Sequence, residues 1–182
     1  VAEPRDVEAW TILGVTRARA GRASDAEAAY ATALELNPSH ALALAGRGSL
    51  LDGEAAVAAF EAAIEAYPRL VEAHVGLANE LGGARGLQLL RRAGDALPES
   101  ATLHGAIVTR AVAAGDPGGA VAYLQDVLTD PMMQSPSVYA LAAELPVDRR
   151  SDALALLEQG AAQYPTNARI AVAKARVERL SG

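Results

Sequence analysis

The sequence predicts an all-α fold of stacked antiparallel helix hairpins, and three observations support this. The 182 residues are 51% hydrophobic but only 4% aromatic, and the abundance of alanine favours helices over strands. A large apolar side chain, such as Tyr30 or Phe60, stands eight residues before most of a series of regularly spaced prolines. These prolines are separated by 30, 30, 33 and 34 residues, at Pro38, Pro68, Pro98, Pro131 and Pro165. A repeat of this period is typical of stacked helical hairpins.

Capping residues mark the helix ends in the first hairpin. Asp6 is placed to cap a helix over about residues 7–20. Gly21 can adopt the left-handed conformation that ends it. Ser24 followed by Glu27 has the spacing of a capping box for the second helix. The stretch therefore predicts one complete helix–turn–helix unit.

This unit resembles the tetratricopeptide repeat (TPR). The Trp, Leu-Gly, Gly, Ala, aromatic, Ala and Pro positions of that family fall, in order, on Trp10, Leu13, Gly14, Gly21, Ala26, Tyr30, Ala33 and Pro38. Arg17 departs from the pattern, because the family usually has tyrosine there. The resemblance covers residues 7–180 and implies a right-handed superhelical solenoid that binds proteins or peptides and is not an enzyme.

The resemblance divides the chain into one array of five repeats and a terminal helix. Their expected ranges are 7–38, 39–68, 69–98, 99–131 and 132–165, with the helix at 166–180. The second and third repeats lack four residues between their helices, which is about one helical turn. Asp116 and Pro117 are placed to open the second helix of the fourth repeat, and Ser135 and Pro136 the first helix of the fifth. The terminal helix has an apolar stripe at Ile170, Ala173, Val177 and Leu180.

In TPR proteins the first helix of each repeat lines a concave groove, so the resemblance also indicates candidate binding residues. Carried over by register, the groove residues are Thr11, Val15, Ala18, Leu42, Ala45, Ser49, Val75, Asn79, Gly105, Thr109 and Val112. These side chains are small and largely uncharged, which suits an apolar extended peptide or an amphipathic helix. Members that grip the acidic tails of heat-shock chaperones use basic and amide residues where this chain has Thr11, Val15, Glu72 and Gly76. The resemblance therefore does not imply that function.

Catalytic and metal sites are not expected. The chain has no cysteine, and no His-x-x-x-His or Glu-x-x-His pair puts two metal ligands on one helix face. His74 and His104 are 30 residues apart at equivalent repeat positions. They are interpreted as residues that fill a structural position, with a metal site as the alternative. No catalytic triad or phosphate-binding loop is recognisable, and no cofactor is expected.

Charge and hydropathy restrict the partners. The net charge of −6 argues against nucleic acid, which requires a basic surface, and no apolar run is long enough to span a membrane. The basic residues Arg169, Lys174, Arg176 and Arg179 of the last helix are not expected to share one face. They are interpreted as solvent-exposed, with docking of an acidic partner as the alternative.

The sequence thus predicts a protein-binding adaptor, and the alanine and arginine bias favours a bacterial origin. A homo-oligomerisation or structural module, or the regulatory part of a longer protein, stays open as an alternative. The chain begins with Val1, which suggests a processed or excised segment. The cytoplasm is favoured as its compartment, and the periplasm or cell envelope stays open.

Overall fold

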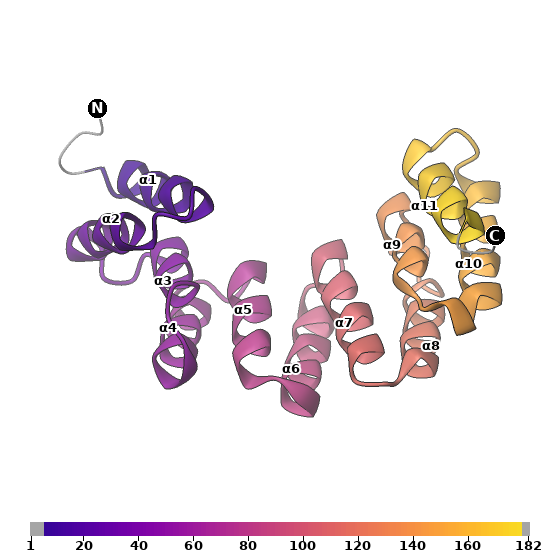
Figure 1. Ribbon diagram of the computed structural model, residues 1–182, viewed down its shortest axis with the longest axis horizontal. Helices are drawn as coiled ribbons and strands as arrows, with labels where there is room; N and C mark the ends of the chain where they lie inside the picture. The colour runs from indigo at the N-terminus through magenta and orange to yellow at the C-terminus, as the bar shows by residue number, and fades with distance from the viewer. Residues whose placement is uncertain (1–5, 180–182) are drawn as a thin grey trace. The chain divides into compact units, whose positions relative to one another are not determined.

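The computed structural model describes residues 6–179, and all the secondary structure within this range is helical (Figure 1). Contacts divide the chain into two compact units that meet between Leu89 and Leu90. We call them unit one and unit two and describe each separately.

Unit one contains two and a half hairpins. Its elements are α1 (Val7–Arg19), α2 (Ala23–Leu36), α3 (Ala41–Gly48), α4 (Gly53–Ala66), α5 (Val71–Leu81) and the first half of α6 (Gly83–Ala96). Unit two begins within α6. It continues with α7 (Ala101–Ala113), α8 (Pro117–Val127), α9 (Pro136–Ala140), the 3-10 turns η1 (Leu141–Glu144) and η2 (Val147–Arg149), α10 (Arg150–Gln163) and α11 (Ala168–Arg179).

The helix ends of the first hairpin agree with the sequence at two points and differ at one. The Asp6 carboxylate accepts a hydrogen bond from the Ala9 backbone N–H at 3.0 Å, and Gly21 has a φ of 73° after α1. The capping box is wrong, because α2 begins at Ala23 and Ser24 already lies inside the helix. At the start of α2, the Asp25 carboxylate instead accepts a hydrogen bond from the guanidinium of Arg22, the residue before the helix, at 2.6 Å.

Two later helix starts are capped as the sequence predicts. Asp116 accepts from the Gly119 N–H at 2.8 Å, and Pro117 is the first residue of α8. Ser135 accepts from the Val138 N–H at 3.4 Å before Pro136 opens α9. Both prolines stand where a backbone N–H would have no helical partner.

The four-residue deletions shorten first helices and leave second helices unchanged. α3 has 8 residues and α5 has 11, against 13 in α1 and α7. The second helices α2, α4 and α6 each have 14. The second helices of the shortened repeats still bury their large side chains, Phe60 in α4 and Leu90 in α6.

In unit one, aromatic rings are packed against glycines of neighbouring helices. The buried ring of Tyr30 lies where a side chain at Gly14 would be, 2.5 Å from an ideal Cβ position, and it also fills the space beside Gly46. Phe60 occupies the equivalent place one repeat later, against Gly48 and Gly76. The glycines therefore let the helices approach closely enough to enclose each ring.

Unit two also packs an aromatic ring against a glycine, but here the ring belongs to the first helix of the repeat and the glycine to the second. Tyr139 of α9 is almost fully buried, and its ring lies 2.7 Å from the ideal Cβ position of Gly160 on α10. A side chain at Gly160 would therefore collide with the Tyr139 ring. The terminal helix α11 buries Ile170, Ala173 and Val177, as the sequence predicts. Leu180, the last member of the predicted stripe, lies outside the described residues.

Candidate interaction surfaces and related structures

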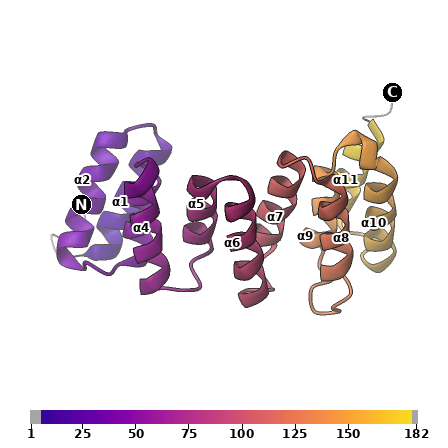
Figure 2. The same ribbon diagram turned by 90° about the horizontal axis from the view of Figure 1, so that it is seen from below.

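Within each unit, the first helices of successive repeats lie side by side. α3 contacts α1 and α5 in unit one, while α9 and η1 contact α7 and α11 in unit two (Figures 1 and 2). We call the solvent-facing sides of these two rows the first-helix faces. To the face of unit one we assign, by repeat register, Val15, Ala18, Leu42, Ser49, Val75 and Asn79. To the face of unit two we assign Gly105, Thr109 and Val112 by the same register, with Ser137, Glu144, Arg169, Val172, Arg176 and Arg179.

Two of the predicted groove residues are buried and cannot contact a partner. Thr11 is 3% exposed, donates a hydrogen bond to the Val7 carbonyl at 2.8 Å and lies 3.3 Å from His40 Nδ1. Ala45 is 6% exposed and packs in the Phe60 cluster. The expectation is wrong for both. The short α3 and the turn before it lie directly against neighbouring helices, and this covers both side chains.

The other predicted groove residues are accessible. Leu42, Ser49, Asn79 and Thr109 are exposed. Val15, Ala18, Val75, Gly105 and Val112 are half-buried. Leu42 matters most, because its side chain is 46% exposed although it is a large hydrophobic residue. That these residues bind a partner stays a prediction.

The equivalent histidines serve as structural hydrogen-bond partners. His74 Nε2 donates to the Pro68 carbonyl at 2.8 Å, and His104 Nε2 donates to the Pro98 carbonyl at 2.7 Å. Each ring therefore ties the start of a repeat to the end of the preceding one. Within residues 6–179, no group of three or more His, Cys, Asp or Glu side chains is arranged to hold a metal ion.

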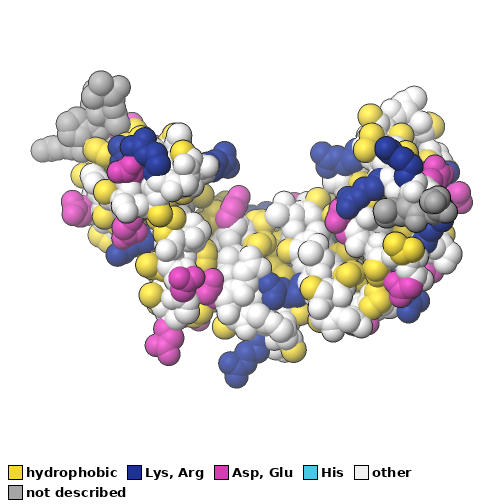
Figure 3. Space-filling model, viewed as in Figure 1, with side chains coloured by type: hydrophobic (Ala, Val, Ile, Leu, Met, Phe, Trp, Pro, Cys, Tyr) yellow, Lys and Arg dark blue, Asp and Glu magenta, His cyan; other side chains and the backbone are white. Residues whose placement is uncertain are grey.

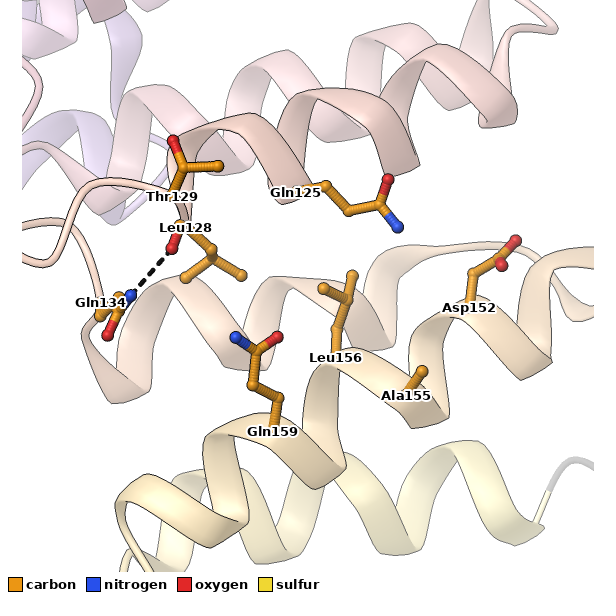
Figure 4. A pocket seen from close by; sticks show the side chains of 8 residues that line it. All are labelled: Gln125, Leu128, Thr129, Gln134, Asp152, Ala155, Leu156 and Gln159. Atoms are coloured by element: carbon orange, nitrogen blue, oxygen red, sulfur yellow. Dashed lines mark hydrogen bonds between the residues drawn. The ribbon is translucent and has the colours of Figure 1, made fainter.

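A cavity of about 400 Å³ opens between α8 and α10 in unit two (Figure 4). Buried Leu128 and Leu156 contribute its apolar lining, and Gln125, Thr129, Asp152, Ala155 and Gln159 line its exposed parts. Gln134 also borders the cavity, but its amide donates to the Leu128 carbonyl at 2.9 Å. The lining contains no pair of nucleophile and base. Its side chains can bind a polar group but offer no evident catalytic arrangement.

A polar network fixes the linker beside this cavity. Gln163 donates to the Gln134 side chain at 2.8 Å and accepts from the Tyr139 hydroxyl at 3.0 Å. The Tyr164 hydroxyl donates to the Gln134 backbone carbonyl. These bonds join both ends of the fifth repeat beside the cavity.

The basic side chains of α11 are organised in a way that the sequence reasoning missed. Arg169, Arg176 and Arg179 lie on the same side of the helix as Val172, and Lys174 lies elsewhere. Lys174 instead pairs with Glu158 at 3.4 Å and Glu178 at 3.9 Å. The spacing of the three arginines in the sequence would have predicted this shared side. It was missed because Lys174 was considered together with them. Figure 3 shows basic side chains gathered over α9 and α11.

Comparison with known proteins gives structural neighbours only. No protein-family model and no curated protein matches the chain. Among solved structures it is similar to a thermophilic TPR protein of Thermus thermophilus, with 21% identity, a TM-score of 0.59 and coverage of 94% of this chain and 98% of that one. The chain has the TPR fold.

Two further TPR-type structures show the same likeness. Pseudomonas aeruginosa PilF is 22% identical with a TM-score of 0.62, and the match covers 98% of this chain and 86% of that one. YrrB, described as a TPR protein with an unusual peptide-binding site, is 20% identical with a TM-score of 0.50, covering 93% and 92%. At these identities the likeness concerns the fold. Across residues 6–179, no helix has the length and apolar character needed to cross a membrane.

Proposed function

We propose that this chain is a non-catalytic protein–protein interaction module that binds a peptide or helix of a partner on its first-helix faces. The observation that carries the proposal is the exposure of large apolar side chains on these faces. Leu42 is 46% exposed in unit one and Val172 is 66% exposed in unit two. A partner that covers them gains the free energy of removing apolar surface from water.

The chemistry of the two faces supports a peptide or helix as the ligand. The other residues assigned to the face of unit one, Val15, Ala18, Ser49, Val75 and Asn79, carry no charge, so a partner would be held there mainly by apolar contact. The solved structure of YrrB, with its unusual peptide-binding site, supports peptide binding as a function of this fold. The alternatives are self-association through the same faces and a regulatory role within a longer protein.

Selection of peptide ligands tests the proposal. A library of random peptides displayed on phage would be selected on the intact chain, and the recovered peptides would be titrated by fluorescence anisotropy. Leu42→Arg places a charge on the first-helix face. Leu36→Arg is the matched control, because Leu36 is 40% exposed but lies at the end of the second helix α2.

We expect some of the selected peptides to bind the Leu36→Arg variant with native affinity. The same peptides should bind the Leu42→Arg variant at least about tenfold more weakly, because binding would bury the new arginine charge without a partner. Circular dichroism confirms that both variants remain folded. Peptides that bind both variants with native affinity would show that unit one uses another surface. Light scattering that gives a dimer mass, lost in Leu42→Arg, would favour self-association.

A further inference from the structure

We propose that the first-helix face of unit two binds an acidic segment of a partner protein, in which carboxylates flank an apolar side chain. The proposal rests on the proposed function and adds the chemical class of the partner. Three arginines and one valine of α11 carry it: Arg169, Val172, Arg176 and Arg179.

These four residues form one stripe along the terminal helix. Their spacings of three, four and three residues place them within one side of an α-helix, where neighbours three and four apart adjoin. Arg169 and Arg179 are exposed, and Val172 is 66% exposed between Arg169 and Arg176. An apolar contact is therefore bordered by guanidinium groups.

Contacts with the preceding repeat place this stripe on the first-helix face. Arg169 donates to the Ser137 hydroxyl of α9 at 2.6 Å, and Arg176 donates to the Glu144 carboxylate of η1 at 3.0 Å. Both bonds join a first helix to the first helix before it. Each uses one terminal nitrogen of a guanidinium that has five N–H donors. The side chains are thus positioned, and donors remain for a ligand.

The charge of this stripe is opposite to that of the protein. The chain has a net charge of −6, yet the stripe has three positive charges, of which Arg176 pairs with the Glu144 carboxylate. The Arg176–Glu144 pair is itself exposed, with side chains 59% and 44% accessible. Such a pair contributes little stability, so a ligand carboxylate can compete with Glu144 for Arg176.

Guanidinium groups bind carboxylates with paired, charge-assisted hydrogen bonds, which gives the stripe its preference. Val172 adds the requirement for an apolar side chain between the carboxylates. Arg169 and Arg176 are two helical turns apart, about 10 Å along the axis, and three residues of an extended peptide span about the same distance. One short acidic segment is therefore long enough to reach both arginines.

Fluorescence anisotropy with the intact chain tests the proposal. The probe is a labelled peptide, Gly-Glu-Glu-Leu-Glu-Glu-Gly, and its control replaces each glutamate by glutamine. We expect the glutamate peptide to bind about tenfold more tightly than its glutamine counterpart and to lose affinity as salt is added. Equal binding of the two peptides would overturn the proposal.

Variants locate the binding. Arg169→Gln/Arg179→Gln should weaken the glutamate peptide about tenfold, since charge-assisted bonds are lost. Arg91→Gln/Arg92→Gln, on exposed positions of α6, is the matched control and should bind with native affinity. Glu144→Gln releases Arg176 and should strengthen binding several-fold, a gain that damage to the fold would not produce. Equal loss in both double variants, or no gain in Glu144→Gln, would overturn the assignment.

Two further measurements exclude other occupants. The first is the affinity of a single-stranded oligonucleotide with the same charge as the peptide. If it binds as tightly as the peptide and is weakened equally by Arg169→Gln/Arg179→Gln, the ligand of the stripe is nucleic acid and not a protein segment. Self-association in light scattering that this variant abolishes would make a second copy the occupant. If the glutamate peptide fails but phage-selected peptides still depend on Leu42, only this inference falls and the proposed function stands.

Discussion

His104 Nε2 donates a hydrogen bond to the carbonyl oxygen of Pro98 at 2.7 Å, joining the fourth repeat to the end of the third. A carbonyl only accepts, so Nε2 is the donor in this bond, and His104 Nδ1 lies within hydrogen-bond distance of the Tyr123 hydroxyl, 2.7 Å away. His74 makes the same bond to Pro68 one repeat earlier. The same hydrogen bond thus occurs in two successive repeats. The buried His104 is, in addition, within hydrogen-bond distance of the Tyr123 hydroxyl.

We expect His104→Leu to lower the free energy of unfolding by about 1–3 kcal/mol, because it leaves the Pro98 carbonyl and the Tyr123 hydroxyl without their partner. His74→Leu should cost less, since the His74 side chain is only half-buried. Urea denaturation of both variants measures the difference. A double-mutant cycle with Tyr123→Phe isolates the side-chain pair, and equal losses at His74 and His104 would contradict the assignment.

The contact of Tyr30 with Gly14 predicts the effect of adding one methyl group. Alanine is favoured over glycine in a helix by about 1 kcal/mol, but its Cβ would lie 2.5 Å from Tyr30 Cε1. Overpacking of a core costs about 1–3 kcal/mol, so we expect Gly14→Ala to destabilise the protein in thermal denaturation.

The control for this prediction is the same change in a Tyr30→Ala background. Tyr30→Ala alone should cost about 3–5 kcal/mol because it opens a cavity. With the ring removed, Gly14→Ala should become neutral or stabilising through helix propensity alone. If Gly14→Ala destabilises the protein equally in both backgrounds, the Tyr30 ring is not the group that clashes with the added methyl group.

Local signals allowed the sequence to predict most of the fold. Tyr30 and Gly21 were identified correctly because proline spacing and turn chemistry act over a few residues. Ser24 was misassigned because the helix begins at Ala23, two residues earlier than a cap at Ser24 requires. Thr11 was misplaced for a different reason: its burial depends partly on His40, which lies 29 residues away in the chain. Such non-local contacts leave no trace in local sequence periodicity.

The capping assignments predict a contrast between two exposed positions. Asp116→Ala removes the acceptor for the Gly119 N–H, so we expect a loss of about 1 kcal/mol in the free energy of unfolding. Ser24→Ala should change it by less than about 0.5 kcal/mol, because Ser24 lies within α2 and makes no cap. Urea denaturation of the two variants is the measurement. If Ser24→Ala lowers the free energy of unfolding as much as Asp116→Ala does, Ser24 caps α2 after all and this assignment is contradicted.

The stability of unit two should fall in alkaline solution because of Tyr123. The pKa of Tyr123 is raised to about 12, chiefly by burial and also by the Asp95 and Asp126 carboxylates, while Arg91 acts in the opposite direction. In the unfolded chain the pKa is about 10. Above that pH the unfolded state loses the proton while the folded state keeps it, so the contribution of Tyr123 is complete below pH 10. It is lost as the pH rises toward 12.

Comparison with Tyr123→Phe isolates this effect. Burial also raises the pKa of Tyr30 and Tyr139, but both tyrosines are present in each protein and their contributions cancel. The variant starts from a lower stability because it loses the bond to His104. Its free energy of unfolding should then decline less steeply than that of the native chain between about pH 10 and pH 12. Parallel declines in urea titrations across this range would mean that Tyr123 ionises equally well in both states.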